Sequence, residues 1–79
     1  MHVQIYTWST CSFCAQAREL LDDHDVSWSE QSLDGDRVAA ERMTDWFGRA
    51  VMPYVVVDGE PLGGLEELRA WLADTESHP

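Results

Sequence analysis

Apolar and polar residues change their spacing several times along the chain, and each change predicts a different element. Segments rich in β-branched and aromatic residues, or alternating between apolar and polar positions, predict strands. Segments whose apolar residues recur every three or four positions predict helices. The expected order is β-α-β-α-β-β-α, with strands at 2–7, 26–33, 54–57 and 60–63 and helices at 11–24, 36–47 and 65–74.

Each expected helix has one apolar face that can pack against a sheet. These faces comprise Ala17, Leu20, Leu21 and His24 in the first helix, Ala39, Met43, Trp46 and Phe47 in the second, and Leu65, Leu68 and Leu72 in the third. We expect Gly48 to end the second helix and Asp58-Gly59 to form the turn of a hairpin. Pro61 predicts that the last strand lies at a sheet edge, and residues 75–79 are expected to be frayed.

Strands that alternate with helices predict an α/β fold, here a four-stranded mixed sheet flanked by three helices. The chain has 79 residues, which leaves room for one domain, expected to span residues 1–79. Its hydrophobic fraction of 44% is enough for a compact core. The first residues lack a basic signal-peptide region, and the longest apolar run, 50–57, is too short to cross a bilayer. We therefore expect a cytoplasmic protein.

The charge of the chain restricts its partners. Fifteen acidic residues stand against five basic ones, all arginine, for a formal net charge of −10. Such a field repels nucleic acids and anionic membranes, so neither is expected as a partner. In a reducing cytoplasm, cysteines are more typical of a catalytic or metal site than of a static disulfide.

The only two cysteines, Cys11 and Cys14, stand three residues apart where the first strand gives way to the first helix. The unpaired N–H groups and the dipole at a helix N-terminus favour a thiolate there. Cys14 lies one turn further along, on the same face, where the helix shields it. This asymmetry predicts Cys11 as the nucleophile and Cys14 as the resolving thiol of a thiol–disulfide exchange.

Two other interpretations of the cysteine pair stay open at this point. The two thiols could be inert core residues, or they could form half of a zinc site. Zinc would need two further ligands at suitable spacing, and the scattered His2, His24 and His78 show no such pattern. We therefore expect no mononuclear metal site.

Three motifs follow one another along the chain: "IYTWSTCSFC", "VMPYVVVDGEPLGG" and "GGLEEL". Together they resemble a glutaredoxin of the small bacterial dithiol type, and the similarity covers nearly the whole chain. The resemblance implies a thioredoxin-like fold and glutathione-dependent thiol–disulfide oxidoreductase activity. It implies glutathione as cosubstrate and disulfide-containing or glutathionylated proteins as substrates. The small size of the chain, by itself, favours a monomer.

The resemblance also implies a glutathione site beside the nucleophile. The residues expected to contact glutathione are Trp8, Thr10, Phe13, Arg49, Val51, Met52, Pro53, Gly64, Leu65, Glu66 and Glu67. Met52-Pro53 matches the cis-proline position of the family, where the backbone of Met52 would pair with the cysteinyl part of the ligand. Gly64 would let the backbone approach the ligand, and the following helix N-terminus would hold its γ-glutamyl carboxylate.

Charged side chains would complete this implied site. Arg49, next to the Met52-Pro53 loop, is expected to meet a carboxylate of glutathione. Glu66 and Glu67 stand where the family usually has two aspartates, and one of them could meet the ammonium group of the ligand. Acidic residues are also favourable in a helix first turn without any ligand.

The chain departs from the family pattern at positions that leave two alternatives open. Trp8 stands where many glutaredoxins carry a lysine, so that positive charge is missing. Ser12 replaces the commoner proline, as in family members that hold a [2Fe–2S] cluster between two subunits with the first cysteine, here Cys11, and glutathione. The other alternative is a thioredoxin-like electron donor served by a reductase, because such proteins share the CxxC motif and the cis-proline.

Overall fold

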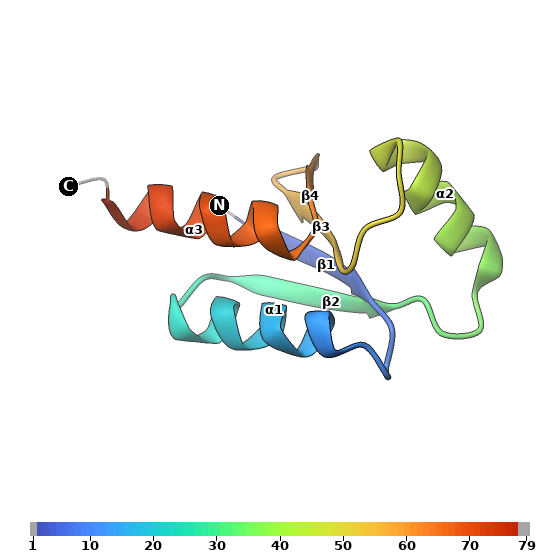
Figure 1. The fold of residues 1–79 in the computed structure, drawn as a ribbon, viewed down its shortest axis with the longest axis horizontal. Coiled ribbons are helices and arrows are strands. Elements are labelled where there is room, and N and C mark those ends of the chain that lie inside the picture. Colours follow the sequence, from blue (N-terminus) through green and yellow to red (C-terminus); the bar gives the residue numbers. More distant parts are fainter. Residues whose placement is uncertain (1, 78–79) are drawn as a thin grey trace.

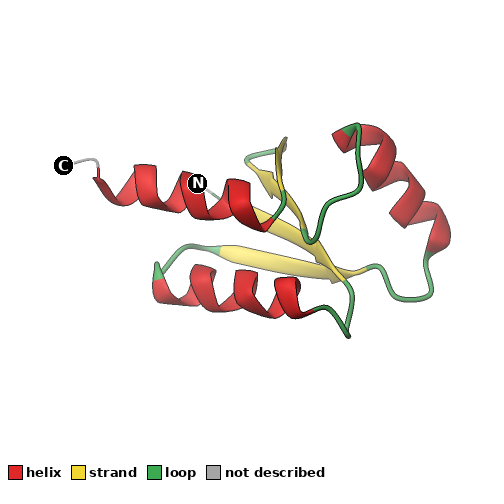
Figure 2. Cartoon of the chain, in the orientation of Figure 1, coloured by secondary structure: helices red, strands yellow, loops and turns green. Residues whose placement is uncertain are grey.

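The computed structural model describes residues 2–77, with side chains as far as residue 74. Within these residues the chain forms four strands and three helices in the expected order (Figures 1 and 2): β1 (Val3–Thr7), α1 (Ser12–Asp23), β2 (Trp28–Ser32), α2 (Arg37–Phe47), β3 (Tyr54–Val57), β4 (Glu60–Gly63) and α3 (Leu65–Ser77). The strands pair in the order β2-β1-β3-β4. β1 is parallel to β2 and antiparallel to β3, so the predicted mixed sheet is confirmed.

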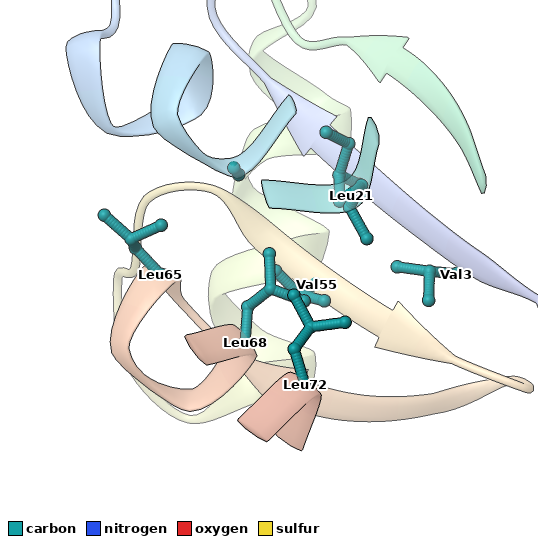
Figure 3. Packing of buried hydrophobic residues seen from close by; sticks show 8 residues of the cluster. Val3, Leu21, Val55, Leu65, Leu68 and Leu72 are labelled. Carbon is teal, nitrogen blue, oxygen red and sulfur yellow. The ribbon is translucent and has the colours of Figure 1, made fainter. Parts of the chain in front are cut away.

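The sheet, with β1 as a central strand, separates two hydrophobic clusters. The residues of β1 alternate in burial, with Val3 and Ile5 fully buried on one face. α1 and α3 cover this face, and their side chains complete a cluster that contains Val3, Ile5, Ala17, Leu21, Val55, Leu65, Leu68 and Leu72 (Figure 3). The opposite face carries a second cluster, the α2-side core, in which Met43 of α2 packs with Leu33, Tyr54 and Val56. In Figure 1, α2 accordingly lies apart from α1 and α3.

The predicted inward faces of α1 and α3 are confirmed, whereas that of α2 is partly wrong. Trp46 is 47% exposed, although the apolar spacing placed it in the core. Phe47 packs inward instead, with its ring centroid 5.0 Å from that of Tyr54. Consecutive residues of a helix are rotated by about 100° from one another, so the two aromatic rings cannot both face the sheet.

Most predicted boundaries are confirmed by the backbone. Gly48 caps α2 in the left-handed conformation (φ 76°). Asp58 and Gly59 both have positive φ (49° and 84°), as a two-residue hairpin turn requires. β4, which contains Pro61, lies at one edge of the sheet, and the largely exposed β2 forms the other.

The end of α3 differs from the expectation. The helix continues to Ser77, so the prediction of a frayed segment is wrong for residues 75–77, and residues 78 and 79 lie outside the described part. Residues 65–78 contain no glycine or proline, which explains why the helix does not stop earlier.

Leu68→Ala tests the core between the sheet and the helices α1 and α3. Because Leu68 is fully buried among the two helices and the sheet, its truncation is expected to lower the free energy of unfolding by about 2–5 kcal/mol. Val38→Ala on α2, where the side chain is 60% exposed, serves as the control and should change it by less than about 0.5 kcal/mol. Urea denaturation followed by circular dichroism measures both values, and equal losses would contradict the assignment of this core.

Candidate functional site

Cys11 is the N-cap residue of α1. Its backbone is extended (φ −105°, ψ 117°), and its sulfur accepts a hydrogen bond from the backbone N–H of Cys14 at 3.3 Å. The thiol therefore takes the place that a serine or aspartate oxygen usually occupies at a helix start. Negative charge on this sulfur is favoured by the N–H group and by the helix dipole. The predicted position of Cys11 is confirmed.

The loop that carries Cys11 is anchored on both sides. The N–H of Cys11 donates to the carbonyl oxygen of Trp8 at 3.3 Å, and the N–H of Ser9 donates to both carboxylate oxygens of Asp34 at 3.2 Å. The ring of Trp8 packs against Tyr54 at a centroid distance of 5.8 Å, in the α2-side core. These contacts fix the approach of the chain to the nucleophilic position.

Cys14 lies in a very different environment, although it is only one helical turn away. It is fully buried, and this burial, followed by a hydrogen bond with the thiol of Cys11, raises the pKa of Cys14 to about 12. The backbone N–H of Trp8 and the positive charge of Arg18 act in the opposite direction. At neutral pH, Cys14 is therefore a protonated, inaccessible thiol behind a half-buried Cys11.

A groove of about 430 Å³ opens beside Cys11. It is lined by Phe13, Arg49, Ala50, Val51, Met52, Gly64, Leu65, Glu66 and Glu67. Met52 joins it to the nucleophile, since its sulfur lies 3.9 Å from that of Cys11. The Met52-Pro53 peptide bond is cis, as the motif predicted. Phe13 and Met52 are each about half exposed and give the groove an apolar rim near the thiol.

The two glycines before α3 bring the far wall of the groove close to the Met52 loop. A Cβ atom on Gly64 would lie 3.2 Å from Cβ of Val51 and 3.4 Å from the carbonyl oxygen of Met52. Gly63 has a φ of 141°, and a Cβ there would collide with the side chain of Glu67 at 2.5 Å. The positive φ of Gly63 favours glycine there, and at Gly64 the lack of a side chain lets the backbone lie close to the Met52 loop.

Glu67 reaches back to the N-terminus of its own helix. One carboxylate oxygen accepts a hydrogen bond from the N–H of Gly64 at 2.7 Å, and the other lies 3.3 Å from the guanidinium of Arg49. The Gly64 bond is the main cause, with Arg49 a smaller one, of a pKa of Glu67 below its ordinary value. This is half of a capping box. Glu66 instead pairs on the surface with Arg69 at 3.3 Å.

The structure brings most of the predicted ligand contacts together. Eight of them line the groove: Phe13, Arg49, Val51, Met52, Gly64, Leu65, Glu66 and Glu67. Three others lie outside its lining: Trp8 in the α2-side core, Thr10 exposed in the loop, and Pro53 buried behind Met52. Ala50, which was not among the predicted contacts, also lines the groove, between Arg49 and Val51.

A polar cluster of Thr7, Arg18 and Glu30, near Cys14, was not predicted from the sequence. The buried hydroxyl of Thr7 donates to the carboxylate of Glu30, which also accepts hydrogen bonds from Arg18. Arg18 first, then Thr7, holds the pKa of Glu30 below its usual range. The sequence indicates only that Arg18 follows Cys14 by four residues on one helix. It does not indicate the pairing of Arg18 with Glu30, because Glu30 lies on β2.

Residues 2–77 contain neither a metal-binding cluster nor a membrane-spanning helix. No group of three or more histidine, cysteine, aspartate or glutamate side chains in this part is arranged to hold a metal ion. None of its helices has the length and the apolar composition to cross a membrane.

Comparison with known proteins identifies the family of this site. A family model named glutaredoxin matches residues 3–62, which include the cysteine pair, the Met52-Pro53 loop and most of the sheet. The chain belongs to the glutaredoxin family. Glutaredoxin 3 from Escherichia coli K12 is 36% identical over 69 residues, 87% of this chain and 83% of that protein. Glutaredoxins are thiol–disulfide oxidoreductases, so the predicted enzyme class is confirmed.

Solved glutaredoxins share the fold. The solution structure of glutaredoxin from Brucella melitensis matches with a TM-score of 0.79 at 26% identity, over 98% of this chain and 82% of that one. The buckwheat glutaredoxin–glutathione complex matches with a TM-score of 0.83 at 18% identity, over 94% and 70%. The predicted thioredoxin-like architecture of this glutaredoxin is therefore confirmed.

Limited alkylation tests the contrast between the two thiols of this glutaredoxin. At neutral pH, iodoacetamide should modify Cys11 and leave Cys14 at least about tenfold less reacted, because the thiolate is the reacting form and Cys14 is buried with a raised pKa. Mass spectrometry of peptides from the reduced, native protein measures the ratio. Urea-unfolded protein is the control and should lose the contrast, whereas equal modification in the native state would contradict the geometry.

Proposed function

We propose that this glutaredoxin uses glutathione to reduce glutathione mixed disulfides and protein disulfides in the cytoplasm. The observation that carries the proposal is the groove that contains Arg49 and the N-terminus of α3, and whose wall residue Met52 contacts Cys11. Glutathione is a tripeptide with a thiol near its middle and carboxylates at both ends. A groove with a nucleophile at one side and anion-binding groups at the other suits that chemistry. The glutathione complex of the buckwheat relative supports it.

The reaction follows from the environments of the two thiols. The Cys11 thiolate attacks the glutathione sulfur of a mixed disulfide, and the protein thiolate leaves and takes up a proton. A second glutathione thiolate then attacks the glutathione sulfur of the adduct, which gives glutathione disulfide and restores Cys11. With a protein disulfide, the Cys11 thiolate first attacks one substrate sulfur, and the other leaves as a thiolate that takes up a proton. Cys14 then attacks the sulfur of Cys11, which closes a Cys11–Cys14 disulfide and releases the second substrate thiolate. Two glutathione thiolates in succession reduce the Cys11–Cys14 disulfide and leave as glutathione disulfide.

The backbone around the groove supplies the positioning. The Met52 backbone, beside the nucleophile, offers edge hydrogen bonds to the cysteinyl part of an extended peptide. Gly64 leaves room for the peptide to approach the start of α3. In this way the ligand sulfur would lie next to Cys11, while the ends of the ligand rest on polar groups away from it.

Glu67 opposes this binding in part. Its carboxylate occupies the Gly64 N–H and neutralises Arg49, the two groups that a carboxylate of glutathione would use. The formal net charge of −10 also repels an anionic ligand. We infer that glutathione binds with modest affinity, because its carboxylate must displace an anion that belongs to the protein.

The two alternatives stay predictions. A [2Fe–2S] cluster would need Cys11 from two subunits and two glutathione molecules, and a reductase-linked donor would need a docking partner. The groove beside Cys11 favours the glutathione-dependent activity over the reductase-linked donor, whereas a cluster would use the same cysteine and the same ligand.

The cysteine variants test the proposed activity. Cys11→Ser should lose essentially all exchange, because it lacks the nucleophile. Cys14→Ser should keep most of the deglutathionylation of a glutathionylated peptide, yet lose most protein-disulfide reduction, because resolution is missing. A glutathione-coupled assay with both substrates measures these rates. Exchange that persists in Cys11→Ser would overturn the assignment of the nucleophile.

Glu67→Gln tests whether Glu67 competes with glutathione. The amide oxygen can still accept from Gly64, but the charge that neutralises Arg49 is gone, so KM for glutathione should fall roughly threefold to tenfold. Glu41→Gln is the matched control, because it makes the same change in net charge on α2, outside the groove lining, at a side chain that is 68% exposed. A rise of KM in Glu67→Gln alone would show that Glu67 binds the ammonium group of the ligand.

A further inference from the structure

The polar cluster of Thr7, Arg18 and Glu30 joins α1 to the two strands beneath it. Arg18 binds Glu30 with two nitrogens: Nε lies 3.0 Å from each carboxylate oxygen, and Nη2 lies 2.6 Å from one of them. Thr7, the last residue of β1 and only 1% exposed, donates its hydroxyl to the same carboxylate. Glu30 is thus held from two elements, and it fixes the guanidinium of Arg18 against the sheet.

Arg18 also lies next to the resolving thiol. It follows Cys14 by four positions on α1, and residues with this spacing are neighbours on one face of a helix. Its side chain is 32% exposed and that of Glu30 28%, so water screens the guanidinium only in part. The other arginines that form ion pairs lie elsewhere. Arg37 pairs with Glu41 on α2, and Arg49 and Arg69 pair with glutamates of α3.

The resolving step creates a need for such a charge. Cys14 must lose its proton to solvent before it can attack, yet burial disfavours the thiolate. Cys11, whose thiol forms a hydrogen bond with Cys14 in the free protein, carries the substrate at that moment and bears no charge. The stabilising groups that remain are the N–H of Trp8 and the cation of Arg18.

We propose that Arg18, held by Glu30 and Thr7, is a positioning residue for the resolving step, in which its charge stabilises the thiolate of Cys14. In this step a bond forms between the sulfurs of Cys14 and Cys11, and the bond between Cys11 and the substrate sulfur breaks. The electron pair leaves with the substrate thiolate, which takes up a proton. The two cysteines are oxidised and the substrate disulfide is reduced. The inference rests on the roles proposed above for the two cysteines.

The test is a single-turnover reaction of the reduced full chain with a peptide that contains one intramolecular disulfide. Acid quenching and mass spectrometry follow the Cys11–peptide adduct and its conversion to the Cys11–Cys14 disulfide. In Arg18→Gln, conversion should slow roughly fivefold to tenfold and the adduct should accumulate, since a partly screened charge is lost beside the thiolate. Arg18→Lys, which keeps the charge, should restore the rate to within about threefold.

Two controls separate this effect from general damage. Arg37→Gln removes the same charge at a side chain that is 92% exposed on α2, and it should convert the adduct as the wild type does. In a Cys14→Ser background, Arg18→Gln should form the adduct at an unchanged rate, because that step needs only Cys11. If Cys14→Ser forms no adduct, the proposed role of Cys11 fails, and that result is distinct from any effect of Arg18.

The remaining outcomes decide the proposal. Conversion at the wild-type rate in Arg18→Gln, or equal slowing of adduct formation and conversion, overturns it. If circular dichroism shows that Arg18→Gln does not fold, Thr7→Val replaces it, because this variant removes an anchor of Glu30 without changing any charge. Thr7→Val should slow conversion by roughly twofold, and an unchanged rate would then overturn the proposal.

Discussion

The burial of the central strand β1 is the constraint from which the site follows. Val3, Ile5 and Thr7 face the α1–α3 layer with almost no exposure, and β1 is paired on both sides. The strand can therefore neither rotate nor slide without exposing apolar surface or breaking two ladders. Its end is fixed at Thr7, and the short loop that follows delivers Cys11 to the start of α1 at one defined place.

Helix geometry then gives the two thiols opposite properties. As the N-cap residue, Cys11 stands at the end of α1, half exposed and facing N–H groups. Cys14 lies one turn inside the helix, and its side chain is buried between α1 and the sheet. The same three-residue spacing thus yields one thiol that reacts with ligands and one that reacts only with its neighbour. A wider spacing would separate the sulfurs, and a narrower one would place them on different faces of the helix.

The sequence predicted the features that depend on local chemistry. Apolar periodicity indicated the inward faces of α1 and α3, and glycine and proline indicated the end of α2, the hairpin and the edge strand. It could not predict contacts that depend on how elements meet. Glu30 reaches Arg18 only because β2 pairs in parallel beside β1. Trp8, which was predicted to contact the ligand, packs on Tyr54 outside the lining of the groove. Trp46 was misplaced because only the tertiary structure decides which of two adjacent aromatic residues faces inward.

The arginine contacts limit how strongly this acidic chain, which has no lysine, can attract an anionic ligand such as the glutathione proposed above. Four of the five arginines pair with a glutamate, in the pairs Arg18–Glu30, Arg37–Glu41, Arg49–Glu67 and Arg69–Glu66. Few positive charges are then available to attract a ligand, so recognition has to depend on fixed backbone N–H groups and on exchange of one ion pair for another. Salt screens the repulsion by the whole protein and also weakens the half-exposed Arg49–Glu67 pair. Both effects ease entry of the ligand, whereas screening of its own contact with Arg49 opposes it. Because the first two effects act together, added salt should impair this groove less than one that relies on an unpaired lysine.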